Sequence, residues 1–300
     1  MKSILIFFLF VMGIVLQSSG QRVIYMRDAD SKLPLPFATA ECTEKSWGIY
    51  SDSAGKVMIP EPIWQTGTVT FSFVGHASIS QGEVLKKDTI YLQKLPNKLD
   101  EVIIKNCKEK EKKKLQIRRR NDDYYLGFGA KSVGAIWASF VPNIYNKRGT
   151  INAISFGAVS FNKAALATAP VRLRFYEWDS ILQVPGEEIT HEAIDVIPGK
   201  FKWVTIDLSK YHLPISATGI VVGFEMFDAG QQYHYNVVHN MSDGTKKEWE
   251  GYGWGIEAIR NVMGFHRTPG GKWNSQATAF DKNKKRVGPA VGLSIEVCKE

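Results

Sequence analysis

Short runs of alternating apolar and polar residues, interrupted every eight to twelve positions by turn formers, dominate this sequence. Between 68 and 74, for example, Val69, Phe71 and Phe73 fall on one face of an extended strand, while threonine and serine fall on the other. This period of two is typical of half-buried β-strands, and residues 23–105 show no helical periodicity. We therefore predict an all-β fold.

The same alternation places the individual strands. The expected strands are 23–26, 37–42, 48–51, 56–60, 68–75, 88–93 and 101–105 in the first part of the chain, and 150–161, 170–178, 201–209, 219–227, 232–240 and 292–298 in the second. The segment 51–55 joins two of these runs. Because Asp52 can hydrogen-bond its own backbone and Gly55 can adopt a positive φ, this segment predicts a hairpin turn. The aromatic and β-branched runs 201–208 and 219–225 are expected to pair, and such pairing indicates a jelly-roll-like β-sandwich.

The first twenty residues have the order of a secretory signal. Lys2 supplies a positive charge, residues 4–16 are apolar, and small residues follow at 18–20. The apolar run has 13 residues, whereas a membrane-spanning helix needs about 20. We therefore expect residues 1–20 to be removed, with cleavage between Gly20 and Gln21. The mature chain would then be exported to the periplasm, the outer membrane or the extracellular space.

Positive charge is concentrated in one segment. The chain has a net charge of +8, and residues 105–120 contain nine basic and two acidic residues, a net of +7. The charges elsewhere almost cancel, which argues against a folded face that binds nucleic acid. We interpret 106–122 as a solvated basic linker, with a helix between Cys107 and Arg120 or peripheral contact of 105–120 with an anionic membrane surface as alternatives. It would separate a first domain, 21–105, from a second, 123–300.

Three cysteines, Cys42, Cys107 and Cys298, are too few and too scattered for a disulfide framework. A bridge between Cys107 and Cys298 could tie the end of the chain to the junction between the domains. Free or buried thiols are the other reading, and the one we favour, because spacing alone does not establish disulfide geometry.

Five short motifs follow one another in the first domain. They are LPFA at 35–38, GIYSDSAGKV at 48–57, FSFVGH at 71–76, IYL at 90–92 and LDEVII at 99–104. In this order they resemble the carboxypeptidase regulatory-like domain of Gram-negative envelope proteins, and the resemblance covers about 80 residues. It implies a transthyretin-like Greek-key sandwich without catalytic activity. It also implies an envelope location, since this family often precedes the plug of TonB-dependent outer-membrane receptors.

The sequence lacks the common catalytic and metal-binding motifs. None of its six histidines lies in a His-x-x-Glu or His-Glu-x-x-His arrangement, and no Gly-x-Ser-x-Gly elbow occurs. His234 and His239 are five residues apart, which places them on opposite faces of a strand rather than around one metal ion. The segment 127–132 is expected to be a surface loop rather than a phosphate loop, and Glu187 and Glu188 are expected in an exposed turn. We predict no catalytic residue, no metal and no cofactor.

An aromatic and glycine-rich stretch is the best candidate for a binding site. The candidate binding residues are Trp249, Tyr252, Trp254 and Trp273. The glycines between them could leave the rings exposed on loops, where flat aromatic faces stack on sugars or contact a protein. The alternative, which is the more common fate of tryptophan, is that these rings pack the second core.

The sequence therefore predicts a non-enzymatic exported envelope protein that binds a glycan or a protein partner. A hydrolase acting on glycan or peptide through the second domain, or an accessory of TonB-dependent outer-membrane machinery, are the alternatives. We expect no nucleic-acid partner, and the oligomeric state is left open.

Overall fold

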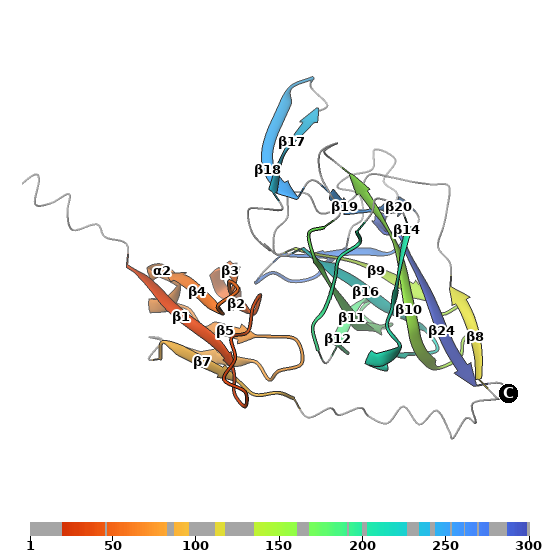
Figure 1. Ribbon diagram of the computed structural model, residues 1–300, viewed down its shortest axis with the longest axis horizontal. Coiled ribbons are helices and arrows are strands. Elements are labelled where there is room, and N and C mark those ends of the chain that lie inside the picture. The colour runs from red at the N-terminus through yellow and green to blue at the C-terminus, as the bar shows by residue number, and fades with distance from the viewer. Residues whose placement is uncertain are drawn as a thin grey trace, which may run out of the picture.

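The computed structural model describes residues 20–45, 47–82, 87–95, 112–117, 135–160, 168–190, 192–199, 203–226, 234–240, 244–252, 254–260, 262–268, 270–275 and 287–298. These residues form two β-sandwiches side by side, which confirms the all-β prediction (Figure 1). The expected signal segment before residue 20, the strand at 101–105 and the loop at 127–132 lie outside the described residues. Among the described residues, no helix is both long enough and apolar enough to cross a membrane.

The first sandwich consists of a three-stranded and a four-stranded sheet. In the first sheet, β1 (Gln21–Asp28) lies between β4 (Lys56–Pro60), which is antiparallel to it, and β7 (Thr89–Leu92), which is parallel. The second sheet has the order β3 (Trp47–Tyr50), β2 (Thr39–Cys42), β5 (Val69–Ser72) and β6 (Ile79–Gln81). A short helix, α2 (Glu61–Thr66), and a 3-10 turn, Thr43–Lys45, complete the domain. Side chains from both sheets, among them Ile24, Ile59 and Phe71, fill the core between them.

The turn at 51–55 forms as its residues require, but it is not a hairpin. Asp52 Oδ1 accepts hydrogen bonds from the backbone N–H groups of Ala54 and Lys56, at 2.9 Å each, and Gly55 has a φ of 74°. However, β3 pairs with β2, whereas β4 pairs with β1. The turn therefore carries the chain from one sheet to the other, and the hairpin prediction is wrong. Local turn chemistry reverses the chain without deciding which strand the next run will pair with.

The second sandwich has a six-stranded and a seven-stranded sheet. The first contains β14 (Trp203–Asp207), β10 (Gly149–Ser160), β24 (Val291–Cys298) and β8 (Lys112–Ile117), with β15 (Pro214–Ile215) and β19 (Trp254–Ile256) also pairing with β10. The second contains β12 (Val184–Glu188), β11 (Val171–Asp179), β16 (Gly219–Glu225), β9 (Ile136–Pro142), β21 (Gly264–Arg267) and β22 (Asn274–Ser275), with β13 (Ile194–Val196) also pairing with β11. Phe156 of β10 meets Phe224 of β16 between the sheets, with ring centroids 5.1 Å apart.

Two smaller pairs and a turn accompany these sheets. β20 (Ala258–Arg260) pairs with β23 (Val287–Pro289), and a 3-10 turn, Ser209–Tyr211, follows β14. β17 (His234–Asn240) pairs with β18 (Lys246–Tyr252), and Figure 1 shows this hairpin projecting from the second sandwich. The runs at 201–208 and 219–225 became β14 and β16, which lie in different sheets, so the predicted pairing of these two strands is wrong.

The basic segment between the domains contains a strand, so two sequence predictions are wrong. β8 pairs with β24 from Lys112, opposite Cys298, to Ile117, opposite Leu293. Ile117 is buried in the second core, and Lys112 Nζ lies 3.0 Å from Glu296 Oε1. Residues 112–117 are therefore neither solvated linker nor helix, and the second domain includes them rather than starting at 123. The three lysines are compatible with a strand because β8 is at the edge of its sheet.

Of the two cysteines that the structure describes, one is a free thiol and the other forms a disulfide. Cys42 is a free thiol buried in the first core, and burial raises its pKa. Cys298, at the end of β24, is disulfide-bonded, so the favoured prediction of free thiols is wrong for this residue. Cys107 lies outside the described residues.

Candidate functional site

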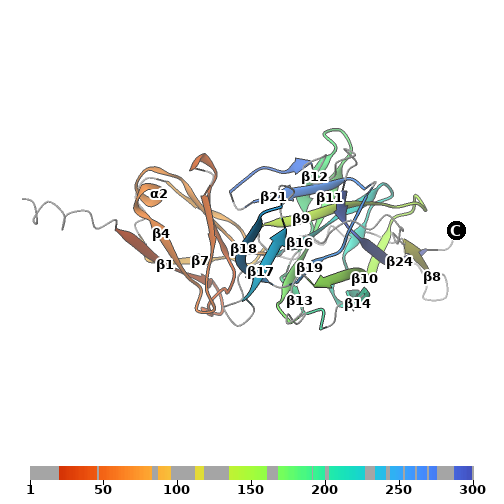
Figure 2. The same cartoon turned by 90° about the horizontal axis from the view of Figure 1, so that it is seen from above.

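The first sandwich packs against the outward face of the seven-stranded sheet. Along β11, Val171, Leu173 and Phe175 point into the core. The alternate residues Arg172, Arg174, Tyr176 and Trp178 therefore lie on the outward face, as a period of two requires. Figures 1 and 2 show the two sandwiches next to each other, and in Figure 1 β3, β2 and β5 lie nearer the second sandwich than β1 and β4. The outward face of β11 is thus where the two domains meet.

Three contacts fix this junction. Tyr50 of β3 donates a hydrogen bond from its hydroxyl to Glu225 Oε1 of β16, at 2.6 Å. Arg172 Nη1 donates to the carbonyl oxygen of Phe37, at 3.2 Å, and its guanidinium lies over the Phe73 ring. Gly270, with a φ of +68°, lies so close to β3 that a Cβ there would meet the carbonyl oxygen of Trp47. Side-chain and backbone groups of both domains therefore interlock.

A cluster of charged side chains surrounds these contacts. Arg172 pairs with both carboxylate oxygens of Asp195, at 2.7 and 3.1 Å. Arg174 donates from Nε to Glu188 Oε1 at 2.8 Å and from Nη2 to Glu188 Oε2, and its Nη1 lies 3.3 Å from both oxygens of Glu225. Glu225 is only 1% exposed and Arg172 only 2%. Breaking such a buried pair is costly because the partner left behind keeps an uncompensated charge.

The electrostatic environment keeps the buried carboxylate ionised. Burial alone would raise the pKa of Glu225, but the guanidinium groups of Arg174 and Arg172 outweigh burial and hold that pKa below its usual value. Burial and the nearby Glu225 together raise the pKa of Tyr50 well above its usual value, so Tyr50 stays a neutral donor. A carboxylic acid that donates a proton in catalysis needs the opposite shift, toward a raised pKa.

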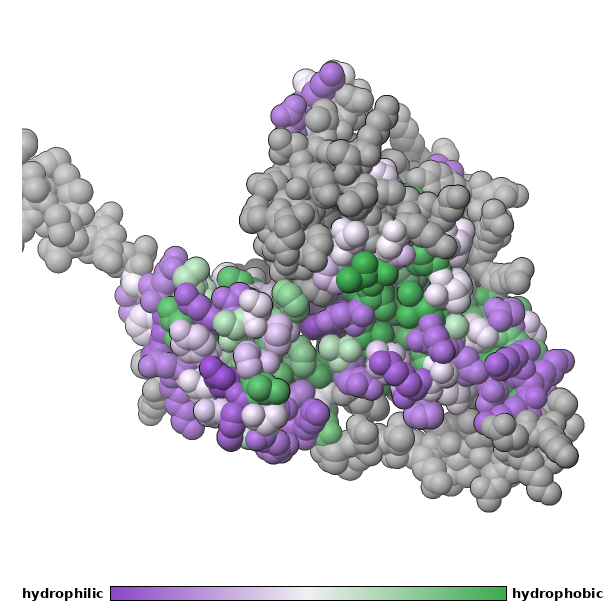
Figure 3. Space-filling model, viewed as in Figure 1, coloured by the Kyte–Doolittle hydropathy of each residue, from purple (hydrophilic) through white to green (hydrophobic). Residues whose placement is uncertain are grey.

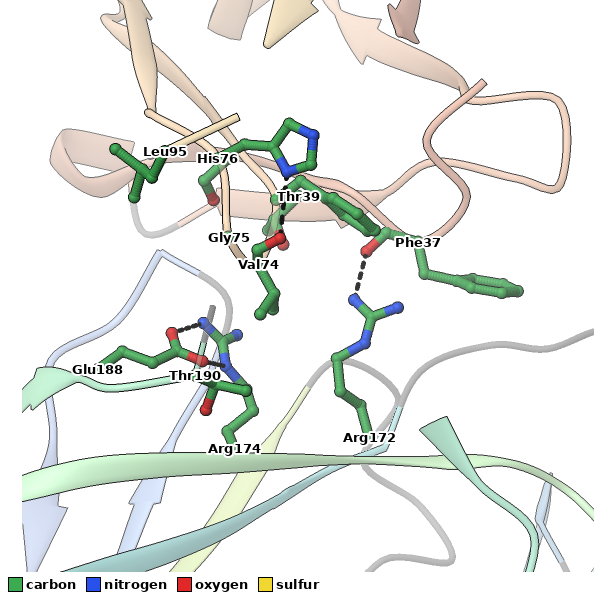
Figure 4. A pocket seen from close by; sticks show the side chains of 12 residues that line it. Phe37, Thr39, Val74, Gly75, His76, Leu95, Arg172, Arg174, Glu188 and Thr190 are labelled. Carbon is green, nitrogen blue, oxygen red and sulfur yellow. Dashed lines mark hydrogen bonds and ion pairs between the residues drawn. The ribbon is translucent and has the colours of Figure 1, made fainter. Parts of the chain in front are cut away.

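A cavity lined by both charged and apolar residues opens beside the cluster, between the domains (Figure 4). Its volume is about 270 Å³, and it is lined by residues 72–76 and Leu95 of the first sandwich and by Arg172, Arg174, Glu188 and Thr190 of the second, with Phe37 and Thr39. A second cavity of about 420 Å³ shares Gly75, Leu95 and Thr190 with it and extends to Lys94 and Tyr211. The two cavities therefore adjoin, and we call the two together the groove along the domain junction.

His76 borders this groove and makes a buried pair. Its Nε2 lies 2.9 Å from Asp28 Oδ2 and its Nδ1 lies 3.1 Å from the carbonyl oxygen of Val74. Both partners are acceptors, because the backbone N–H of Ser31 and the His76 ring hold the pKa of Asp28 far below its usual value. Asp28 is the last residue of β1, so this pair ties the segment that borders the groove to β1.

Farther along the same outward face lies an aromatic patch, which consists of Phe140, Tyr176, Trp178, Phe265 and Trp273. The rings of Phe140 and Trp178 stack at 4.2 Å, and Trp178 lies 5.9 Å from Phe265. Tyr176 meets Trp273 edge to face at 5.2 Å. Phe140, Trp178 and Trp273 are only partly buried, so their rings reach the surface.

Polar groups border the aromatic patch. Arg267 of β21 lies over the Trp273 ring, at 5.5 Å from its centroid, and no ion pair is found for it among the described residues. The Tyr176 hydroxyl is buried and has no hydrogen-bond partner in the described part of the chain. A buried hydroxyl without a partner costs about 1–3 kcal/mol, so a water or a ligand group is expected to satisfy it.

The predicted binding residues do not form one site. Trp254 is fully buried in the second core and cannot present its ring to a ligand, so its prediction as a surface binding residue is wrong. Trp273 belongs to the aromatic patch. Trp249 and Tyr252 lie in β18, and their side chains are outside the described part of the structure.

Several residues of the junction and the patch were missed from the sequence. Glu188, expected in an exposed turn, lies in β12 and pairs with Arg174, so that prediction is wrong. Trp178 is the last residue of the predicted strand 170–178, and no function was predicted for it. The sequence does carry a pattern that indicates them. Every second residue from 172 to 178 is charged or aromatic, so charged and aromatic side chains share one face of this strand.

No group of histidine, cysteine, aspartate and glutamate residues suited to a metal ion is found within the described ranges. The side chains of His234 and His239 lie outside those ranges. No protein-family model matches the sequence, and no curated protein shows significant similarity to it.

Proposed function

We propose that this chain is a non-enzymatic exported envelope protein that binds a glycan on the aromatic patch of its second sandwich. The observation that carries the proposal is the row of partly exposed rings, Phe140, Trp178 and Trp273, on a sheet face beside the guanidinium of Arg267. Flat aromatic faces stack on the apolar faces of sugars, and nearby polar groups orient the sugar hydroxyls. Arg267, whose guanidinium lies 5.5 Å from the centroid of the Trp273 ring, supplies such a group.

The charged cluster supports a role in holding the domains together rather than in hydrolysis. Glu188 lines the groove, and Arg174 pairs both with it and with the buried Glu225. A glycosidase needs one carboxylic acid with a raised pKa. The lowered pKa of Glu225 is the reverse of that requirement. A hydrolase therefore remains the less favoured proposal.

Export and an envelope location rest on the sequence of the first twenty residues and on the resemblance of the first domain to the carboxypeptidase regulatory-like family. The two-sheet architecture of residues 21–92 supports this resemblance, since that family has a sandwich fold. The disulfide bond of Cys298 supports export, because disulfides persist in oxidising compartments.

Glycan-array binding by the mature chain tests the proposal. We expect retention of a subset of glycans, with Trp178→Ala and Trp273→Ala each weakening binding at least tenfold, since aromatic contacts of this kind dominate affinity. Tyr91→Ala is the matched control, because it removes a partly exposed ring from the first sandwich, and it should leave binding unchanged. Equal binding by the wild type and both tryptophan variants, with unchanged thermal stability, would exclude the aromatic patch as the glycan site.

A further inference from the structure

The outward face of the three-stranded sheet in the first sandwich exposes large apolar side chains. Along β1, Ile24 and Met26 point into the core, so Tyr25 and Arg27 lie on the opposite, outward face. Tyr25 is 37% exposed, Met58 of β4 is 47% exposed and Tyr91 of β7 is 44% exposed. These three are a third of the nine large apolar side chains found exposed among the described residues, and all three lie on one sheet.

The strand register makes these residues neighbours. Val23 is opposite Met58, Tyr25 is opposite both Lys56 and Thr89, and Arg27 is opposite Tyr91. Adjacent strands are about 4.8 Å apart, so the three exposed side chains form one continuous surface. We call this surface the tyrosine face and define it by Tyr25, Met58 and Tyr91.

Cations accompany the tyrosine face. Lys56 and Arg27 lie on the same side of the sheet as Tyr25, and Lys32 places its ammonium 4.6 Å from the centroid of the Tyr91 ring. The acids nearby are engaged. Asp88 pairs with Arg22, Asp30 accepts from Gln93, and Asp52 accepts from the backbone of its own turn.

Within the described ranges, the contacts between the two sandwiches do not involve the tyrosine face. The contacts at the domain junction come from β3 and from Phe37 and Phe73, which flank the four-stranded sheet. In Figures 1 and 2, β1 and β4 lie on the side of the first sandwich turned away from the second. The space-filling view in Figure 3 shows hydrophilic and hydrophobic residues interspersed on the described surface of the first sandwich.

We infer that the tyrosine face docks on an anionic lipid bilayer. Tyrosine is favoured at the membrane interface because its ring is apolar and its hydroxyl stays hydrated, and methionine adds flexible apolar contact. The ammonium and guanidinium groups of Lys32, Lys56 and Arg27 complement lipid phosphates, and each basic residue near an anionic surface adds a measurable, salt-sensitive attraction. A second copy of the chain fits this face less well, because in a symmetric dimer these three cations would face and repel the same three cations of the other copy.

Co-sedimentation of the mature chain with lipid vesicles tests the inference. We expect binding to phosphatidylcholine vesicles that contain phosphatidylglycerol, weaker binding to pure phosphatidylcholine, and loss of binding at high salt. The variant Lys32→Glu/Lys56→Glu should reduce the vesicle partition coefficient at least about tenfold. Tyr25→Ser/Tyr91→Ser should reduce it as well and leave a salt-sensitive remainder.

A matched charge reversal on the second sandwich tests whether vesicle binding depends on the tyrosine face or on the lysine-rich strand β8. Lys113 and Lys114 of β8 are exposed, and Lys113→Glu/Lys114→Glu changes the net charge by the same amount as the first variant. Unchanged binding by this control, with reduced binding by Lys32→Glu/Lys56→Glu, is the expected result. The inference is overturned if wild-type chain does not bind anionic vesicles, or if only the β8 variant loses binding. None of these results depends on glycan binding, which is measured on the other domain.

Discussion

The hydroxyl of Tyr50 lies 2.6 Å from Glu225 Oε1, and this hydrogen bond joins residues 175 positions apart in two different sandwiches. Glu225 also accepts hydrogen bonds from Arg174, so one buried carboxylate connects β3 of the first domain with β11 and β16 of the second. The junction is therefore a buried polar network and not a flexible hinge between independent modules. It follows that substitutions in one domain should change the stability of the other.

We predict that Tyr50→Phe destabilises the protein by about 1.5–3 kcal/mol, because it removes a hydrogen bond to a charged group and leaves the ring in place. Urea denaturation followed by tryptophan fluorescence would measure the change in the free energy of unfolding. Tyr25→Phe is the control, since the Tyr25 ring is partly exposed on the far sheet, and it should have no effect. A Tyr50→Phe protein as stable as the wild type would show that this hydrogen bond does not contribute to stability.

Replacing the carboxylate itself should cost more. Glu225→Ala leaves Arg174 buried with Glu188 as its remaining partner, and losing one member of a buried ion pair costs about 3–5 kcal/mol. Glu187→Ala is a matched control, because Glu187 is exposed next to the same cluster. The comparison of the two unfolding midpoints tests whether the cost comes from the buried pair or from a general change in charge.

Acid should destabilise the folded protein through two carboxylates whose pKa values are both shifted in the same direction. The pKa values of Asp28 and Glu225 are lowered in the folded protein, below their ordinary values of 3.8 and 4.5. In this range the unfolded chain binds more protons than the folded chain, so the stabilisation is present at neutral pH and is lost as the pH falls through and below these ordinary values. Urea midpoints measured from neutral pH downward should decline most steeply below about pH 4.5. Asp28→Asn should make this decline shallower, and an unchanged profile would contradict the role of Asp28.

The sequence predicted strands well and their partners poorly. The run 56–60 became β4 with the predicted bounds, because alternation and turn residues act over a few positions. Pairing depends on residues far apart, which is why the turn at 51–55 leads to another sheet and why β14 and β16 are not neighbours. Alternation also assigns Arg172 and Trp178 to one face of β11 without showing what covers that face. Trp254 illustrates the same limit, since its burial follows from the pairing of β19 with β10.

The strand β8 had a sequence signal that its lysines obscured. Leu115 and Ile117 alternate within KKKLQI, and both contact the second core. We predict that Ile117→Ala destabilises the protein by about 2–4 kcal/mol, as expected for truncating a fully buried isoleucine. Gln116→Ala, at the exposed position between them, should change stability little. If both variants unfold at the same urea concentration as the wild type, β8 does not pair stably with β24.

Cys298, the last residue of the strand β24 that pairs with β8, forms a disulfide. The chain has three cysteines, Cys42 is free, and Cys107 is the remaining partner for Cys298, so we predict a bond between 107 and 298. One thiol should react with a thiol reagent in denaturant without reductant, and three should react after reduction. In the folded protein even Cys42 should react slowly, because burial raises its pKa and excludes the reagent. Cys107→Ser and Cys298→Ser should lower stability to the same extent, about 2–5 kcal/mol, since either substitution opens the same loop. Unequal losses, or three reactive thiols before reduction, would contradict this pairing.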